Sequence, residues 1–184
     1  MTCSDEPASR YKMGEFVSCD PYEKWDIGDD TVVGNFCSLR NVVVGKKCII
    51  WNYVNLYDCT IGDETRIGSF TEIGGSKVGK RCAIQARVFV PPGVTIGDLV
   101  FLGPGVIFTN EKHPRVKVKG DPPFRPEKTK VQEGAIIGAG AVILPGINIG
   151  AHAMVGAGAV VTKSVQAGQT VVGNPARPLG KFRR

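Results

Sequence analysis

The stretch Ile61-Gly62-Asp63-Glu64-Thr65-Arg66 is followed directly by Ile67-Gly68-Ser69-Phe70-Thr71-Glu72. Each six-residue unit, or hexad, starts with an aliphatic residue and a glycine and has a threonine at its fifth position. Outward from these units, aliphatic residues recur at 27, 33, 39, then 44, 50, 56, then 61, 67, 73, and then 78, 84, 90. These triplets start 17 residues apart, one short of three hexads, and the spacing becomes a full 18 after residue 78. Such a regular recurrence indicates a repeat fold.

The pattern continues toward the C-terminus with one interruption. Aliphatic positions fall at 96, 102 and 108, and they resume at 131, 137, 143, 149, 155 and 161. The clearest late hexads are Ile137-Gly138-Ala139-Gly140-Ala141-Val142 and Val155-Gly156-Ala157-Gly158-Ala159-Val160. We therefore predict one repeat domain over residues 27–165 with an inserted loop at 109–130, preceded by a cap segment (1–26) and followed by a short tail (166–184).

The hexad predicts an all-β fold. Three short strands joined by tight bends form one triangular coil, and coils stack as parallel strands about 4.8 Å apart. We expect about seven coils, with the first and fifth positions of each hexad pointing inward. The expected inward fifth positions are Thr31, Cys37, Cys48, Thr65, Thr71, Cys82, Ala141 and Ala159. Phe16, Tyr22 and Trp25 are expected to cap the first coil.

The formal net charge of +6 is unevenly distributed. Residues 1–108 have a net charge of −2, whereas residues 109–130 have +4 and residues 163–184 have +5. Positive charge confined to one loop and one tail favours small anionic partners over a basic face for nucleic acid.

The six cysteines contain no Cys-x-x-Cys pair, and the chain has only two histidines, His113 and His152. This set predicts neither a metal site nor a disulfide framework. We expect reduced and mostly buried thiols, and His152 as a surface residue. No apolar run approaches the roughly 18 residues of a membrane span, and no signal-peptide pattern is evident, so we expect a cytoplasmic protein without membrane association.

Over residues 27–165 the hexads resemble those of the left-handed β-helix, or hexapeptide-repeat, acyltransferases. The run Thr109-Asn110-Glu111-Lys112-His113-Pro114-Arg115, together with Gly173-Asn174-Pro175-Ala176-Arg177, is similar to the nucleotide-sugar N-acetyltransferases that act on UDP- or dTDP-linked 3-amino sugars. The resemblance implies left-handed coils, acetyl-CoA as acyl donor without a metal, and a homotrimer with active sites between subunits. It also implies that the inserted loop walls the neighbouring subunit's active site.

The resemblance places three residues of the loop at the reaction. His113 would be the general base, since histidine can accept a proton near neutral pH. It could also contact substrate or be an ordinary loop residue. Asn110 would face the cofactor sulfur or the reacting amine, and Glu111 would orient His113 or act as base itself. Local turn hydrogen bonds are the alternative for Asn110 and Glu111.

The remaining site residues are assigned to ligands. Arg115 and Gln85 would bind substrate, with Arg115 on a phosphate. The small residues of the late hexads would let a pantetheine arm lie along the coil, while a backbone amide between Gly138 and Ala141 stabilises the oxyanion. The expected cofactor-binding residues are Gly138, Ala139, Ala157, Gly158, Lys163, Pro175 and Arg177, with Lys163 and Arg177 near the CoA phosphates and Pro175 against adenine.

The leading hypothesis is transfer of an acetyl group from acetyl-CoA to the amino group of a nucleotide-linked amino sugar, in cell-surface polysaccharide biosynthesis. An O-acetyltransferase acting on a sugar hydroxyl is the alternative, favoured by the Thr109-x-x-x-His113-Pro114 context. A metal lyase on the same coil needs three histidines per site, one more than the chain has. A non-catalytic assembly subunit would not need the basic proline-rich loop.

Overall fold

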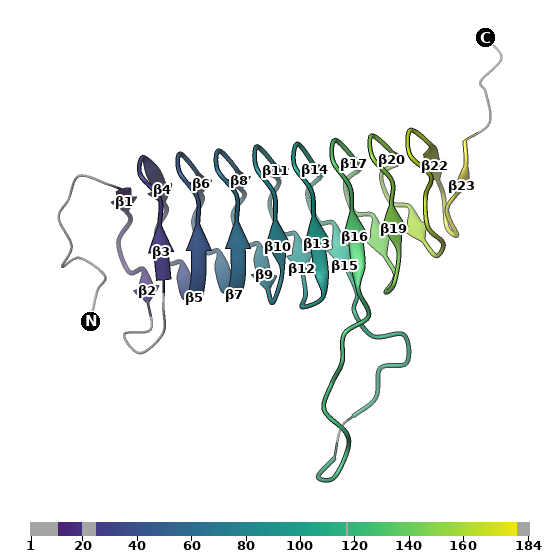
Figure 1. The fold of residues 1–184 in the computed structure, drawn as a ribbon, viewed down its shortest axis with the longest axis horizontal. Helices are drawn as coiled ribbons and strands as arrows, with labels where there is room; N and C mark the ends of the chain where they lie inside the picture. Colours follow the sequence, from purple (N-terminus) through teal and green to yellow (C-terminus); the bar gives the residue numbers. More distant parts are fainter. Residues whose placement is uncertain (1–10, 20–24, 117, 180–184) are drawn as a thin grey trace.

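The computed structural model describes residues 11–19, 25–116 and 118–179, and these ranges contain strands and turns but no helix. It is a left-handed parallel β-helix with the shape of a long prism, from which one loop projects (Figure 1). Within these ranges no helix could cross a membrane. The predicted fold class is confirmed.

Face one of the prism is a sheet of ten strands, of which only the last runs antiparallel to its neighbour. Its strands are β1 (Tyr11–Met13), β4 (Thr31–Val33), β6 (Ile49–Ile50), β8 (Arg66–Ile67), β11 (Ala83–Ile84), β14 (Phe101–Leu102), β17 (Ile136–Ile137), β20 (Met154–Val155), β22 (Thr170–Val172) and β23 (Arg177–Pro178).

The other two faces are joined by β5 (Ser38–Val44) and β7 (Asn55–Ile61), which run through the bend between them. Face two adds β2 (Ser18–Cys19), β9 (Glu72–Gly74), β12 (Phe89–Val90), β15 (Ile107–Phe108), β18 (Val142–Ile143) and β21 (Val160–Val161). Face three adds β3 (Trp25–Ile27), β10 (Lys77–Val78), β13 (Val94–Ile96), β16 (Thr129–Val131) and β19 (Asn148–Ile149).

The pairing register reproduces the spacing of the hexads. Ile49 pairs with Arg66, 17 positions later, whereas Ala83 pairs with Phe101, 18 positions later. Phe101 pairs with Ile136, 35 positions later, so the insertion adds 17 residues to an 18-residue coil without shifting the sheet. The coil therefore tolerates a long excursion at one bend while its strands stay in register.

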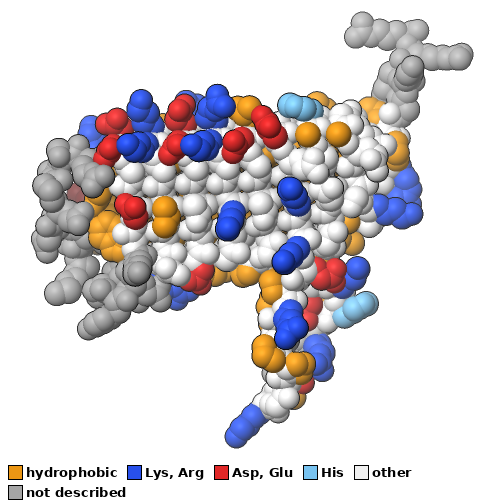
Figure 2. Space-filling model, viewed as in Figure 1, with side chains coloured by type: hydrophobic (Ala, Val, Ile, Leu, Met, Phe, Trp, Pro, Cys, Tyr) orange, Lys and Arg blue, Asp and Glu red, His pale blue; other side chains and the backbone are white. Residues whose placement is uncertain are grey.

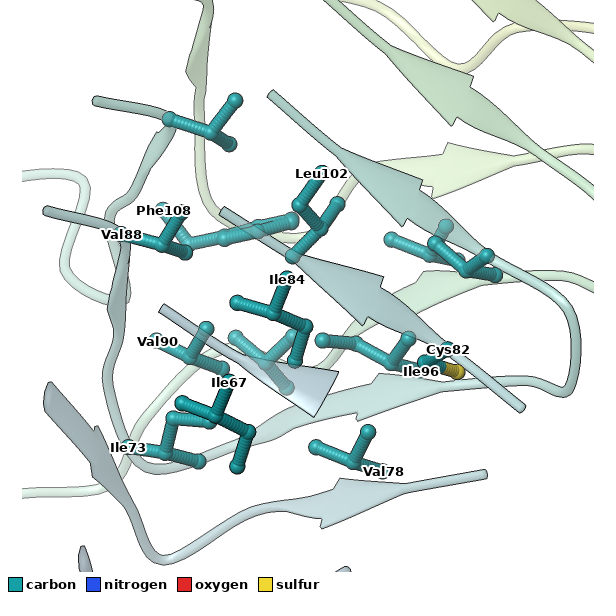
Figure 3. Close-up of a cluster of buried hydrophobic side chains, with 14 of the residues drawn as sticks. Ile67, Ile73, Val78, Cys82, Ile84, Val88, Val90, Ile96, Leu102 and Phe108 are labelled. Carbon is teal, nitrogen blue, oxygen red and sulfur yellow. The ribbon is translucent and has the colours of Figure 1, made fainter. Parts of the chain in front are cut away.

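The core is a single column of buried side chains along the axis of the prism (Figure 3). Ile67, Ile84 and Leu102 come from successive coils of face one and stack directly over one another in Figure 3. The fifth hexad positions are also inside, which confirms the predicted pattern; they are Thr31, Cys37, Cys48, Thr65, Thr71, Cys82, Ala141 and Ala159. The hydroxyls of the three threonines in this set each donate to a carbonyl of the next coil, as Thr65 Oγ1 does to Gly79 O at 2.9 Å, so burial leaves none of them unpaired.

The prism is longer than the hexads predict. Face one has nine parallel strands and therefore nine coil levels, not about seven. The first level forms because Tyr11–Met13 pairs with Thr31–Val33, although the segment lacks the hexad pattern. The last forms because Met154 pairs with Thr170, a spacing of 16 that a search for hexads of fixed length passes over.

The segment boundaries shift accordingly. Thr129 and Lys130, placed in the inserted loop by the sequence, belong to β16, so the loop ends at residue 128. The tail from 166 contains β22 and β23. Trp25 packs against the core near Tyr11, with ring centroids 6.2 Å apart, but Phe16 is exposed at a bend rather than covering the end of the coil. Tyr22 lies outside the described residues.

Three edges separate the faces, and we name them by the faces they join. Edge A joins faces one and two at residues 14–16, 34–36, 51–53, 68–70, 85–87, 103–105, 138–140 and 156–158. Edge B joins faces two and three and carries the loop of residues 109–128. Edge C joins faces three and one at residues 28–30, 45–47, 62–64, 79–81, 97–99, 132–134, 150–152 and 166–168.

Candidate active site

The loop on edge B is held to the prism at both of its ends. The Thr109 N–H donates to Ile143 O at 3.0 Å, and the Glu127 N–H donates to Asn110 O at 3.1 Å. Beyond these bonds the loop projects away from the prism (Figure 1). Its side chains include Val116 and Val118, which are 89% and 67% exposed, so the loop presents apolar surface to its surroundings.

Asn110 sits at the root of the loop and is half-buried. Its Nδ2 donates to Pro92 O at 3.2 Å, which fixes the amide against the preceding coil of edge B. An amide held through its nitrogen keeps its Oδ1 as an acceptor for a ligand. The free Oδ1 agrees with an orienting function for Asn110. The bond to Pro92 O is also of the local kind that the alternative interpretation of Asn110 expects.

His113 is exposed and makes no hydrogen bond with any residue that the structure describes. Glu111 is half-buried, and no hydrogen bond joins it to His113. The neighbouring Lys112 Nζ instead pairs with Glu127 Oε2 at 3.5 Å, across the two ends of the loop. The imidazole is therefore free to face a ligand, but the chain itself does not orient it.

Arg115 is engaged within the loop. Its Nη2 lies 3.4 Å from Asp121 Oδ1, and Asp121 Oδ2 accepts the Val118 N–H at 3.0 Å. The arginine remains mostly exposed, so a phosphate would have to compete with Asp121 for the guanidinium. The sequence could not show this pairing because it depends on how the loop turns.

Edge A carries the predicted cofactor residues Gly138, Ala139, Ala157 and Gly158 on two successive levels, which we call the seam. A side chain at Gly140 or Gly158 would meet nothing within 4 Å, so the seam is open. The N–H groups of Ala139 and Ala157 have no acceptor among the described residues, whereas those of Gly138 and Gly140 are bonded within the coil. These two amides are free to bind a ligand.

The N-terminal half of the same edge is closed by side chains. Asn52 Oδ1 accepts the Asn35 N–H at 2.8 Å, at the bend position that Ala139 and Ala157 occupy further along. Phe36, Tyr53 and Phe70 stack on successive levels with centroids 5.0 Å apart. The change from asparagine and aromatic residues to alanine and glycine therefore opens the edge from residue 103 onward.

Two predicted cations meet at the C-terminal end of the prism. Lys163 and Arg177 line one cavity of about 390 Å³, together with Val161, Ser164, Val165, Gln166, Gln169, Val171, Ala176 and Pro178. Both cations are exposed, and the walls offer amide and hydroxyl groups as further donors. Pro175 is exposed next to this cavity but does not line it.

A single chain does not bring all of these groups together. His113 is on edge B, the seam and Gln85 are on edge A, and face two separates the two edges. His152 is exposed on edge C, as predicted. Sequence reasoning overlooked the outward side chains beside the seam, where Phe101, Ile107 and Ile136 are 37–42% exposed. The hydrophobic outer positions of their hexads are the signal that could have identified them.

The described cysteines provide no nucleophile. Cys37, Cys48, Cys59 and Cys82 are free and buried, as predicted. Burial raises the pKa of all four thiols, that of Cys59 to about 12, so the reactive thiolate is disfavoured. No group of three metal-ligating side chains occurs in the described part of the chain.

Sequence comparison finds the hexapeptide pattern directly. The bacterial transferase hexapeptide family (six repeats) matches residues 41–75 and 128–163, and the hexapeptide repeat of succinyl-transferase matches residues 59–92. A Schizosaccharomyces pombe protein named "Putative acetyltransferase C18B11.09c" is 38% identical over 90 residues. That match covers 48% of this chain and 44% of the yeast protein, so the chain spans less than half of this relative.

Solved structures share the fold over most of the chain. The BC4754 gene product of Bacillus cereus has a TM-score of 0.62 at 21% identity, covering 90% of this chain and 82% of that one. A mutant of perosamine N-acetyltransferase from Caulobacter crescentus, solved with CoA and GDP-perosamine, has a TM-score of 0.51 at 22% identity and covers 86% and 57%. At these identities the likeness is one of fold.

Proposed function

Since the chain belongs to the hexapeptide-repeat acyltransferase family, we propose that it is an enzyme that transfers an acetyl group from acetyl-CoA to the amino group of a nucleotide-linked amino sugar. The observation that carries the proposal is the open seam of edge A, with two unpaired backbone amides and no charged side chain. The Caulobacter enzyme of the same fold was solved with CoA and an amino sugar linked to GDP.

The seam suits an acyl carrier. A pantetheine arm is extended and carries amide groups, and the N–H groups of Ala139 and Ala157 lie one coil apart, about 4.8 Å, along the edge. At the C-terminal end, Lys163 and Arg177 line the cavity where the phosphates of CoA would bind. Pro175, exposed beside this cavity, would pack against the adenine.

The separation of the two edges supports a homotrimer. The edge B loop of one copy, with exposed Val116 and Val118, would lie against edge A of the next copy, beside which Phe101 and Ile136 of face one are exposed. Such a contact joins two different surfaces, and repeating it around a threefold axis closes a ring. Three equivalent active sites would result, each with His113 from one copy and the seam from its neighbour.

In the proposed reaction the amine attacks the thioester carbonyl carbon directly. The C–N bond forms, the C–S bond breaks, and the thiolate of CoA leaves with the electron pair. His113 would accept the proton from the attacking nitrogen, with Glu111 as the alternative base and Asn110 orienting the amine through its Oδ1. The Ala139 N–H would donate to the oxyanion. No acyl-enzyme is needed, in keeping with the buried cysteines.

Thiol release tests the proposal. Purified protein is mixed with acetyl-CoA and a panel of UDP-, dTDP- and GDP-linked amino sugars, with the matching sugars lacking the amine as controls. Turnover with an amino sugar and none with its control is the expected result. Turnover with the plain sugars alone would instead establish the O-acetyltransferase alternative, which the Thr109-x-x-x-His113-Pro114 run favours. Such an enzyme would act in the cytoplasm on precursors of cell-surface polysaccharide.

A further inference from the structure

Arg87 occupies a distinctive position on edge A. It is the third residue of the bend Gln85-Ala86-Arg87, between β11 and β12. The level before it presents Phe70, which ends the stack of aromatic rings, and the level after it presents Gly105, which begins the open part of the edge. The arginine therefore marks the N-terminal end of the open groove, one coil from Gly105 and three from Gly158.

The guanidinium of Arg87 has no partner. It is exposed and forms no ion pair or hydrogen bond with any residue in the described part of the chain. Among the bends of edge A, Arg87 and Glu15 are the only charged residues, and Glu15 is four levels away. On face two the nearest acid in register, Glu72, instead accepts a hydrogen bond from Tyr57 at 3.2 Å.

The bend position of Arg87 is left-handed along the whole edge, and Phe36, Tyr53 and Phe70 adopt this conformation on the three preceding levels. Arg87 has a φ of 60°, in the left-handed region that glycine adopts without penalty. The next three levels of the edge use glycine at this position, namely Gly105, Gly140 and Gly158. Arg87 is therefore the last long side chain at this bend position before the glycine levels, and it borders the open part of the edge.

The same bend provides further donors toward a ligand. The Ala86 N–H has no acceptor among the described residues, and the exposed Gln85 amide stands beside it. The following level, Gly103-Pro104-Gly105, has no long side chain to cover these groups. A guanidinium, a backbone amide and a side-chain amide on one bend form a donor set suited to phosphate oxygens.

We propose that Arg87, with Ala86 N–H and Gln85, binds the diphosphate of the acceptor, so that the nucleotide lies toward the aromatic stack and the sugar amine toward the seam. This inference rests on the proposed function and names the acceptor's contact within it. The phosphates of CoA are assigned to Lys163 and Arg177 at the C-terminal end of the prism. The two phosphate-bearing substrates would then meet end to end over an uncharged stretch of edge A.

The chain offers a matched control for the test. Arg81 lies on the same coil as Arg87, is also exposed and has a φ of 54°, but it is on edge C. Glycine suits both backbones, so Arg87→Gly and Arg81→Gly remove a guanidinium without straining the bend. Arg87→Lys retains the charge but loses the bidentate fork.

The kinetic arm measures both Michaelis constants. Arg87→Gly is expected to raise the KM for the nucleotide amino sugar about 10- to 100-fold, the range of a lost charge-assisted hydrogen bond, and to leave the KM for acetyl-CoA unchanged. Arg87→Lys should fall between wild type and glycine, and Arg81→Gly should match wild type. A rise in the KM for acetyl-CoA instead of the acceptor overturns the inference.

The binding arm does not depend on turnover. Calorimetric titration with UDP, dTDP and GDP alone should show binding of at least one to wild type and to Arg81→Gly, and weakened binding to Arg87→Gly. Equal binding to all three proteins overturns the inference. So does a wild type that acetylates free amino sugars but binds no nucleoside diphosphate, a result that keeps the acetyl transfer. A third outcome separates the two claims: wild type binds a nucleoside diphosphate and Arg87→Gly does not, but wild type turns over no amino sugar. This outcome supports the inference and overturns the proposed function.

Discussion

Substituting proline for Ala139 removes the unpaired seam amide that we assign to the oxyanion. The chain itself shows that the bend accepts proline, because Pro104 occupies the same position one level earlier. Gly105 and Gly140 follow with φ of 70° and 66°, and the Val106 and Ala141 N–H groups close the turns onto Gly103 O and Gly138 O. Proline followed by a left-handed glycine is the preferred sequence of a type II turn.

The expected effects on folding and on catalysis have opposite signs. The Ala139 N–H has no acceptor among the described residues, so its loss breaks no hydrogen bond there, and the proline stabilises the fold by about 0.4–1 kcal/mol through the unfolded state. Loss of one oxyanion donor costs about 2.7–4 kcal/mol in the transition state, or about 10²- to 10³-fold in kcat.

Thiol release gives kcat and thermal unfolding gives stability on the same samples. Ala167→Pro is the matched control, since Ala167 has an equally unpaired N–H within the described ranges and precedes a left-handed glycine, Gly168, but lies on edge C. The control should keep wild-type kcat. A full kcat for Ala139→Pro would refute the oxyanion assignment. A lowered unfolding temperature would refute the argument from Pro104.

Three further predictions address the loop, the cavity and the core. His113→Asn should lower kcat at least about 10²-fold without changing thermal stability, because the imidazole makes no bond within the described chain; near-normal turnover would remove it as the base. Lys163→Ala and Arg177→Ala should each weaken CoA binding about 10-fold by calorimetry. Wild-type affinity for CoA in both variants would place the CoA phosphates elsewhere. Burial raises the pKa of Cys59 from 9.0 to about 12, so between these pH values the unfolded chain binds fewer protons than the folded one. Stability to urea should therefore be full below pH 9 and fall as the pH rises toward 12, and Cys59→Ala should lessen that fall; the same slope in both proteins would contradict it.

The repeat made the coil predictable to the residue. Val32, Ile49 and Arg66 pair at intervals of 17 residues, and later coils are 18 residues long. Both lengths were evident in the spacing of aliphatic residues, because every coil must bury the same positions. The two end levels could not be predicted in this way. Tyr11–Met13 is held by pairing with one neighbouring strand, and its sequence is not constrained by a coil on each side.

The candidate site was predictable in residue type but not in arrangement. The small residues at Ala139 and Ala157 signal an open edge in any coil of this kind, and the structure adds that their amides have no acceptor within the described chain. The partner of Arg115 depends on the loop conformation, which no repeat governs. Equally, nothing in a single sequence relates edge A of one copy to edge B of another, since that relation is a property of the assembly.

Edge C differs from edge A in how its charges are arranged. From residue 29 to residue 98 its charges alternate level by level, and Figure 2 shows acidic and basic side chains side by side along the upper edge. Lys46 Nζ lies 3.4 Å from Asp29 Oδ2, and Lys80 Nζ lies 2.8 Å from Asp63 Oδ2. The Lys80 hydrogen bond lowers the pKa of Asp63, and Asp63 Oδ1 also accepts the Lys46 N–H at 3.0 Å.

These pairs are exposed and individually weak, so their main effect is on binding rather than on stability. Each paired lysine of edge C is held by a carboxylate of the neighbouring coil. An anion approaching the lysine would have to displace that carboxylate. On edge A, Arg87 and the uncovered amides of Ala139 and Ala157 present no such competition within the described ranges. Whether a bend is covered or left open therefore depends on whether the neighbouring level supplies a partner for it.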